Sequence, residues 1–260
     1  MGLLGLPLIA EIMAGSGLDW LLIDMEHAPN SLESVLAQLY AVSGYSSVPV
    51  VRVPHGETVI IKQVLDLGAQ NILVPMISTP DKAKAVAAMI RYPPTGTRGV
   101  GSALARSARW NRVEGYLRDD AEDVSLFVQI ETQEGVNNAR AIAATPGGDG
   151  VFIGPSDLAA SMSLIGQQTH PDVVAAVKHA FADIDATGKP FGVNAFDSDT
   201  ARDYAAAGAR FILVGADVAL LARGSEALAQ TYIGRTDPGP RAPSSECARS
   251  TRNPERCRKL

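Results

Sequence analysis

The chain repeats one pattern eight times before residue 216: a short apolar run, often β-branched, followed by a longer amphipathic stretch. Near-continuous apolar runs are typical of strands buried on both faces of a parallel sheet. Eight strands alternating with helices predict an α/β fold, a (β/α)8 TIM barrel, with a doubly wound open sheet as the alternative. The expected strands are Gly2–Leu6, Trp20–Met25, Val48–Val53, Asn71–Met76, Ser125–Ile130, Gly150–Gly154, Phe191–Phe196 and Phe211–Gly215.

The segments between these runs carry helix signals. Several begin at capping residues and several end at a glycine, as helices commonly do. The expected helices are Ser31–Tyr40, Thr58–Leu67, Asp81–Arg91, Gln133–Ala143, Pro171–Thr187 and Ser198–Ala207. The connection between Met76 and Ser125 is longer than one helix requires, and its Gly- and Arg-rich part includes Trp110. Such loops are often functional lids, and a plain surface excursion is the alternative.

Charge is unevenly distributed along the chain. The whole sequence carries a net −5, but residues 234–260 hold seven basic and three acidic residues with four prolines. We expect this tail to be disordered and residues 1–233 to form one barrel domain. The acidic balance argues against nucleic-acid binding, and no apolar run is long enough to predict a membrane span. Both cysteines lie in the tail, so the domain has no thiol for a disulfide, zinc site or catalysis, and a cytoplasmic setting is expected.

Polar residues follow several predicted strands. In a barrel, the carboxyl ends of the strands meet at one mouth, where catalytic groups are found. A chance convergence of several acidic groups with an arginine and a histidine is much less expected than the chance presence of any one of them. The residues expected to converge are Asp24, Glu26, His27, Arg52, Gln129, Glu131 and Asp157.

Glu131 and Asp157 follow consecutive strands, which lie side by side about 4.8 Å apart. Two carboxylates so placed repel each other unless a proton or a cation lies between them. An all-oxygen pair suits a hard divalent ion such as Mg²⁺ or Mn²⁺. The alternative is a structural pair held by helix N-termini and an arginine.

The positions of the lysines limit the classes of reaction that the chain is expected to catalyse. None of them follows a predicted strand, which argues against Schiff-base chemistry. Arg52 can stabilise a carboxylate or a developing oxyanion, and His27 can move a proton near neutral pH. The other three histidines are expected at the surface. These residues predict metal-assisted chemistry on a small anionic substrate.

Five segments resemble the HpcH/HpaI family of class II pyruvate aldolases: Leu21–Asn30, Ile60–Gln70, Arg91–Gly101, Val128–Thr132 and Val151–Ser161. The resemblance runs in order from about residue 6 to residue 233. It implies a (β/α)8 barrel that assembles as a homo-oligomer, usually a hexamer built from dimers that exchange a C-terminal helix. It also implies reversible cleavage of 4-hydroxy-2-oxoacids, in aromatic compound catabolism, to pyruvate and an aldehyde.

The resemblance further assigns roles to individual residues. It implies a divalent ion (Mg²⁺, Mn²⁺ or Co²⁺) on Glu131 and Asp157, and His27 as the base, with Asp66 raising its basicity. Arg52 would stabilise the enolate. The bound oxoacid would be contacted by Gln129, Gly154 and Ser156, the last standing where many relatives have alanine.

Two departures from the family accompany the resemblance. The segment before the first strand is short, and the tail after Ile233 is unlike the family's terminus.

We expect an acidic aldehyde to lie near Arg106 or Arg109. Two other functions stay open: an acyl-CoA ester lyase, which would need a basic groove, and an oxoacid-binding barrel without turnover.

Overall fold

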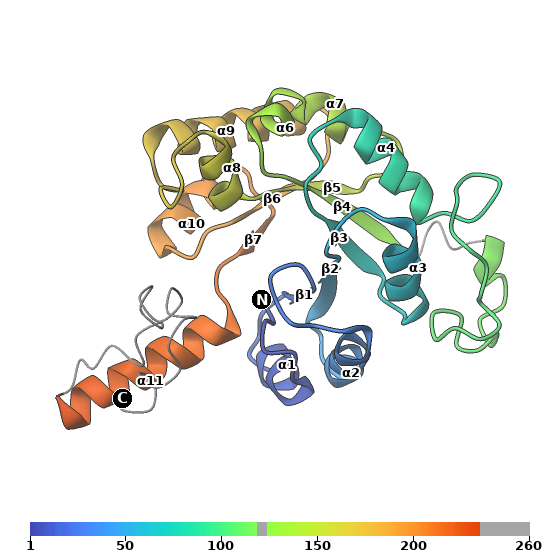
Figure 1. The fold of residues 1–260 in the computed structure, drawn as a ribbon, viewed down its shortest axis with the longest axis horizontal. Coiled ribbons are helices and arrows are strands. Elements are labelled where there is room, and N and C mark those ends of the chain that lie inside the picture. Colours follow the sequence, from blue (N-terminus) through green and yellow to red (C-terminus); the bar gives the residue numbers. More distant parts are fainter. Residues whose placement is uncertain (119–123, 235–260) are drawn as a thin grey trace, which may run out of the picture. The chain divides into compact units, whose positions relative to one another are not determined.

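The computed structural model describes residues 1–118 and 124–234 and contains seven parallel strands arranged around one axis (Figure 1). Each strand pairs with the next one in the chain, in the order β1-β2-β3-β4-β5-β6-β7. A doubly wound sheet would reverse its strand order, so the barrel prediction is confirmed and the alternative is excluded. The strands are β1 (Trp20–Asp24), β2 (Val48–Arg52), β3 (Asn71–Val74), β4 (Ser125–Ile130), β5 (Gly150–Ile153), β6 (Phe191–Asn194) and β7 (Phe211–Leu213).

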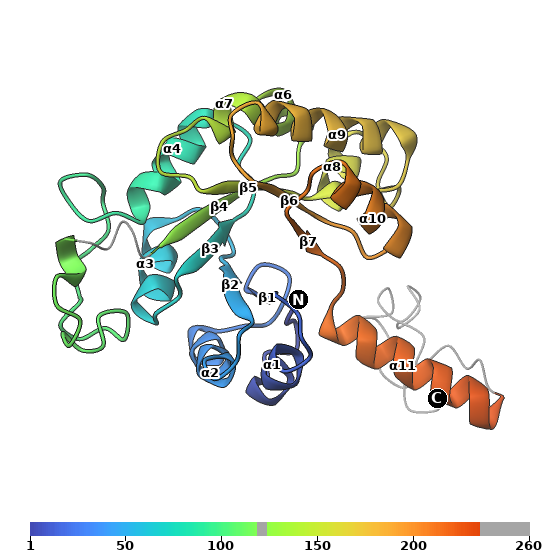
Figure 2. The ribbon, with the colours of Figure 1, turned by 180° about the vertical axis from the view of Figure 1, so that it is seen from behind.

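Within residues 1–219, helices cover the outside of the strands, as the views from both sides show (Figures 1 and 2). The predicted helix at Gln133–Ala143 is interrupted at Asn138, where the backbone leaves the helical region, so two short helices replace it. The helices are α1 (Pro7–Ala14), α2 (Leu32–Val42), α3 (Thr58–Asp66), α4 (Pro80–Met89), α6 (Gln133–Asn137), α7 (Ala139–Ala143), α8 (Pro155–Ser161), α9 (Pro171–Asp185), α10 (Ser198–Ala206) and α11 (Asp217–Ile233).

The N-terminal segment occupies the eighth position of the barrel. The regular strand predicted at Gly2–Leu6 is wrong: only an isolated parallel bridge pairs Gly2 with Ile23 of β1. On the other side, the buried Asp217 carboxylate accepts a hydrogen bond from the backbone N–H of Leu3 at 3.0 Å. The segment therefore bridges β1 and the residues that follow β7, but it is held partly by a side chain, which no strand pattern predicts.

One layer of the barrel interior consists of apolar side chains from alternate strands. These are Leu22, Leu73, Phe152 and Leu213, from β1, β3, β5 and β7. Side chains two residues apart point to the same face of a strand. Because Leu22 and Phe127 belong to this interior cluster, Asp24 and Gln129 lie one step nearer the carboxyl ends on the same face. The alternation of side chains along each strand thus places polar groups next to this apolar layer, on the side of the carboxyl ends.

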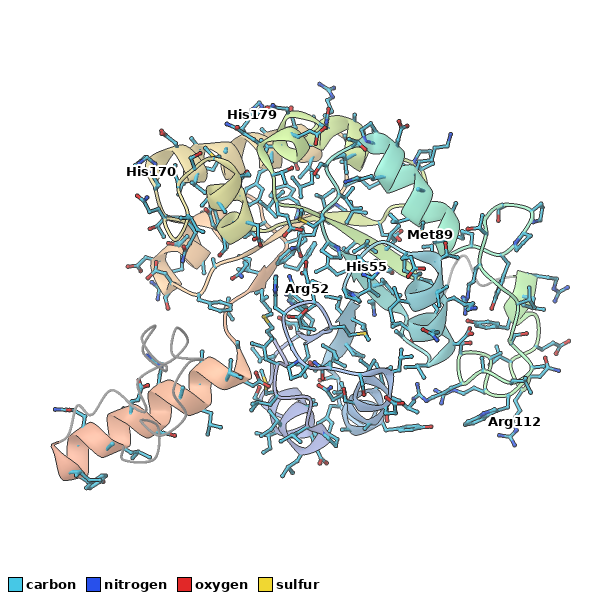
Figure 3. All side chains as sticks on the ribbon, viewed as in Figure 1. Arg52, His55, Met89, Arg112, His170 and His179 are labelled. Atoms are coloured by element: carbon cyan, nitrogen blue, oxygen red, sulfur yellow. The ribbon has the colours of Figure 1, made fainter. Side chains whose placement is uncertain are left out.

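The long connection before β4 packs beside α3, at the amino ends of the strands. Its Arg98 side chain is fully buried, with the guanidinium carbon 4.5 Å from the ring centre of Tyr92 and 5.9 Å from that of Tyr116. Arg98 Nη2 lies 3.2 Å from Oδ1 of Asp66, the last residue of α3. The connection is therefore anchored by a buried cation, and Arg112 within it lies far from Arg52 (Figure 3).

Leu220–Leu260 forms a second compact unit, separate from Met1–Ala219. Its described part is the remainder of α11, which exposes a series of large apolar side chains: Leu220, Leu221, Leu228, Tyr232 and Ile233. The tail predicted to be disordered, residues 235–260, lies outside the described residues. Within 1–118 and 124–234, no helix has the length and apolar character needed to cross a membrane.

Candidate active site

Arg52, at the end of β2, is held by a buried carboxylate from the neighbouring strand. Its Nε and Nη2 donate hydrogen bonds to Asp24 Oδ1 and Oδ2 at 2.7 and 2.8 Å. Asp24 is fully buried at the end of β1, in register with Arg52. Burial lowers the pKa of the guanidinium, but Asp24 and the other carboxylates more than offset this, and the net shift is upward. A bidentate pair of this kind fixes both the charge and the direction of the arginine.

The third arginine nitrogen faces β4. Arg52 Nη1 donates to Gln129 Oε1 at 3.3 Å, and Gln129 Nε2 in turn donates to Glu131 Oε2 at 2.5 Å. The other carboxylate oxygen of Glu131, Oε1, accepts a hydrogen bond from the backbone N–H of Met76 at 2.6 Å. Met76 has a φ of 59°, a conformation that is costly for a residue with a side chain. Both oxygens of Glu131 are therefore oriented by fixed donors.

Glu131 is almost fully buried, with 1% of its surface exposed, and the charge of a second carboxylate, Asp157, acts on it. Burial raises the pKa of Glu131, and Asp157 in the first turn of α8 raises it further, while the bonds from Gln129 and Met76 lower it. A bound cation would relieve this unfavourable charge pairing. Two carboxylates, with the remaining positions left to water and substrate, fit a hard divalent ion such as Mg²⁺. Within the described residues, no third Asp, Glu, His or Cys completes a larger cluster.

Gly154, at the end of β5, has no room for a side chain. A Cβ there would lie 3.0 Å from Glu131 Oε2 and 3.3 Å from Gln129 Nε2. Its φ of −101° is accessible to any residue, so the constraint is the contact with Glu131 rather than the backbone. The substrate contact expected of this glycine therefore comes with a second role, which is to leave space for a carboxylate.

Replacing Gly154 with alanine is expected to weaken divalent-ion binding by about 10-fold or more, because the methyl group displaces an oriented ligand. The free energy of unfolding should change much less. Calorimetric titration with Mn²⁺ and chemical denaturation measure the two effects. Gly148, where an added Cβ would meet only Thr145 O at 3.8 Å, provides the matched Gly→Ala control. An unchanged Mn²⁺ affinity in Gly154→Ala would contradict the steric argument.

The turn after β1 places two more ionisable groups beside Arg52. The Asp24 carboxylate accepts the backbone N–H groups of Glu26 and His27, at 3.1 and 3.3 Å, and so shapes this turn. Glu26 Oε2 lies 3.1 Å from Arg52 Nη1 and 3.6 Å from His27 Nε2. Burial raises the pKa of Glu26 to about 7, with Arg52 opposing. The His27 side chain is 58% exposed, so much of the imidazole is open to solvent.

Three expected residues lie elsewhere. Asp66 ends α3 at the amino ends of the strands, whereas His27 follows the carboxyl end of β1, so the two are not brought together within one chain. Arg106 donates to the carbonyl of Leu67 at 2.9 Å and stacks on Tyr40. With Arg109 it lines a cavity of about 60 Å³ beside Gln70 and Val124, again at the amino ends. The hypothesis that Arg106 or Arg109 guides the aldehyde is therefore not supported within one copy.

The structure places the other expected residues as follows. Gln129 lies between Arg52 and Glu131, and the exposed Ser156 precedes Asp157 in α8. The five lysines before residue 234 lie on α3, α4 and α9 and in the loop before β6, away from the strand carboxyl ends. His170 caps α9 and His179 lies on its surface (Figure 3). Asp24 and Glu26 were expected at the mouth without a role, and the Met76 N–H was missed because methionine gives no signal for a positive φ.

Comparison with known proteins identifies the class of this barrel. A family model described as HpcH/HpaI aldolase/citrate lyase matches residues 4–224. The chain belongs to this family and is a lyase-class enzyme, so the resemblance seen in the sequence is confirmed. It is 50% identical over 223 residues to a 4-hydroxy-2-oxo-heptane-1,7-dioate aldolase of Salmonella dublin, covering 86% of this chain and 85% of that protein.

Solved structures give the same result for the fold. An HpcH/HpaI aldolase/citrate lyase family protein from Burkholderia cenocepacia J2315 is 41% identical with a TM-score of 0.85, covering 88% of this chain and 93% of that one. An HpcH/HpaI aldolase from Desulfitobacterium hafniense DCB-2 is 26% identical with a TM-score of 0.80, over 88% and 91%. The citrate synthase SbnG is 27% identical with a TM-score of 0.80, over 90% and 91%.

Proposed function

We propose that this enzyme is a divalent-metal-dependent pyruvate aldolase that reversibly cleaves 4-hydroxy-2-oxoacids to pyruvate and an aldehyde. The observation that carries the proposal is the continuous network from Asp24 through Arg52 and Gln129 to Glu131 at the mouth of the barrel. This network places the fixed guanidinium group of Arg52 near the oriented, buried carboxylate of Glu131. The curated relatives named as 4-hydroxy-2-oxo-heptane-1,7-dioate aldolases support the substrate class.

Glu131 and Asp157 would hold the ion, Mg²⁺, Mn²⁺ or Co²⁺. When bound, it would supply Lewis-acid stabilisation of negative charge on the substrate oxygens. Gln129, Gly154 and Ser156 would contact the oxoacid. Arg52, whose Nε and Nη2 are occupied by Asp24, directs Nη1 toward the mouth, where it would stabilise the enolate oxygen.

His27 would act as the base in cleavage. It takes the proton from the 4-hydroxyl group, the O–H electrons form the aldehyde carbonyl, and the C3–C4 bond breaks with its electrons moving into the pyruvate enolate. In the condensation direction the protonated His27 returns this proton to the new alkoxide. The exposure of the imidazole fits a group that exchanges protons with an incoming substrate.

The function is tested by incubating the Mn²⁺-loaded protein with pyruvate and a series of aldehydes, and by measuring product formation with succinic semialdehyde and neutral aldehydes. Formation of 4-hydroxy-2-oxoacids is expected, and removal of the metal should abolish it. Deuterium exchange into the pyruvate methyl group separates an enzyme from an oxoacid-binding barrel without turnover. Turnover of acyl-CoA esters but not of pyruvate would favour the acyl-CoA lyase, although residues 1–233 carry a net −9 rather than a basic groove's charge.

The role of Asp66 needs a second copy of the chain. Asp66 and His27 lie at opposite ends of the strands, so the same chain does not supply both to one site. We propose that Asp66 raises the basicity of a neighbouring copy's His27 in a homo-oligomer, a hexamer by family resemblance. The exposed apolar side chains of α11 support such an assembly. The cysteine-free sequence from residue 1 to 233 supports a cytoplasmic setting.

Mixing two inactive variants tests this arrangement. His27→Asn and Asp66→Asn, each much less active alone, are expected to recover about one quarter of wild-type activity when unfolded and refolded together, because random assembly creates some intact sites. Refolding either variant alone gives the baseline, and light scattering confirms the assembly. If the mixture stays at the baseline, Asp66 does not act across copies.

A further inference from the structure

Glu26 is the charged group at the mouth that the proposed mechanism does not use. Its side chain is 14% exposed, and among the described residues its Oε2 atom has no hydrogen-bond donor. The Arg52 Nη1 atom is near it, at 3.1 Å, but without the angle of a hydrogen bond. A buried carboxylate oxygen without a donor is costly, so it indicates a position where a donor is present during function.

The nearest group that can become a donor is the imidazole of His27, whose Nε2 lies 3.6 Å from the same oxygen. Both residues are fixed by one carboxylate, because Asp24 accepts their two backbone N–H groups. The backbone of the turn that carries Glu26 and His27 is therefore held in one conformation by Asp24. Once the imidazole carries a proton on both nitrogens, its Nε2–H faces this oxygen, so the counter-ion is already in place.

We propose that Glu26 is a positioning residue that stabilises the imidazolium formed when His27 takes the substrate proton. The inference rests on the proposed aldolase function and deepens it. The charge change at His27 occurs within the chemical step, so a carboxylate 3.6 Å away acts on the transition state more than on the bound substrate. Asp66 would act on the same ring from a neighbouring copy, whereas Glu26 acts from the same chain.

The charges around Glu26 agree with this role. Burial disfavours its ionised form most strongly, and with Glu131 and Asp24 it raises the pKa of Glu26 to about 7, whereas Arg52 and His27 favour the ionised form. Arg52 already donates two hydrogen bonds to Asp24, so its dependence on Glu26 is small. A proton arriving on His27 adds a positive charge 3.6 Å from Glu26, which favours the ionised form of Glu26.

The test is Glu26→Gln in the metal-loaded enzyme. We expect kcat for oxoacid cleavage to fall by about 10- to 100-fold, since general-base catalysis contributes about 100-fold or more. The KM and the affinity for oxalate, which resembles the enolate, should stay within about threefold, because neither senses the proton on His27. Glu26→Asp, which keeps the charge but withdraws it, should give an intermediate kcat.

The double variant that combines Glu26→Gln with His27→Asn shows whether Glu26 acts through His27. If Glu26 acts through His27, adding Glu26→Gln to His27→Asn causes no further loss of kcat. A further loss, an unchanged kcat in the single variant, or a loss of oxalate affinity as large as the loss of kcat would each overturn the proposal. A wild-type enzyme that makes no product would instead refute the proposed function itself.

A matched control comes from another histidine–carboxylate pair. His179 Nε2 lies 3.8 Å from Asp183 Oδ2 on α9, and Figure 3 shows His179 in the outer layer, far from Arg52. Asp183→Asn removes the same charge from beside an imidazole. It should leave kcat and KM unchanged, and a loss equal to that of Glu26→Gln would show that the effect is not local.

Discussion

Replacing Glu131 with glutamine is expected to weaken divalent-ion binding by at least about 100-fold, since removing a group that merely supports a ligand already costs about 10- to 100-fold. Activity at saturating pyruvate should fall on the order of 100- to 1,000-fold. The change removes a negative charge and turns an amide N–H₂ toward either Gln129 Nε2 or the Met76 N–H, both of which are donors. Titration with Mn²⁺ and steady-state kinetics measure these effects.

Without metal, the Glu131→Gln variant should be folded, and its stability relative to the wild type should increase as the pH rises. Burial raises the pKa of Glu131 above its ordinary 4.5, so the folded protein binds this proton more tightly than the unfolded chain does. The free energy of unfolding of the wild type therefore falls as the pH rises above about 4.5, and glutamine removes this loss. Thermal unfolding at several pH values should show the melting temperature of Glu131→Gln gaining on the wild type toward alkaline pH.

The same protonation makes ion binding depend on pH, because the ion competes with the proton on Glu131. Wild-type affinity for Mn²⁺ should rise with pH, with release of protons on binding. Glu134→Gln, on an exposed position three residues along the chain, is the control and should behave as the wild type. If Glu131→Gln bound Mn²⁺ normally, Glu131 would not be a ligand and the proposed metal site would be wrong.

Much of the barrel could be predicted because each strand is buried on both faces and each helix on one. The continuous apolar runs and the capping residues record that burial in the sequence. The mouth could be predicted for the same reason: the alternation from Phe127 to Gln129 in β4, and on to Glu131 directly after it, continues the inward face past the apolar layer. The sequence pattern is sufficient to predict where a side chain lies when that depends only on its position along one strand.

Other features depend on contacts distant in the chain. The segment before α1 is held by Asp217, more than two hundred residues away, and therefore does not form the predicted strand. Arg98 would be placed at the surface from its residue type, but Tyr92, Tyr116 and Asp66 bury it. The family role of Asp66 likewise gave no indication that it would lie at the other end of the barrel from His27.

Replacing Asp24 with asparagine is expected to lower the free energy of unfolding by about 3–5 kcal/mol, because it leaves a buried arginine without its main partner. Asp24 is fully buried and accepts four hydrogen bonds, two from Arg52 and two from the turn that carries Glu26 and His27. An amide cannot accept all four. Chemical denaturation measures the loss, and kcat for cleavage should fall with it, since one carboxylate orients the arginine and the base together.

Two comparisons separate the buried pair from the general effect of removing a charge. Asp199→Asn breaks an ion pair with Arg202 in which both side chains are largely exposed, and it should cost less than about 1 kcal/mol. Combining Asp24→Asn with Arg52→Gln should cost less than the sum of the two single changes by about 1–3 kcal/mol, because each single change strands a buried partner. The double variant should nevertheless be inactive, since it lacks the cation at the mouth. Additive costs would mean that Asp24 and Arg52 are not coupled, and the network proposed to carry the chemistry would lose its first link.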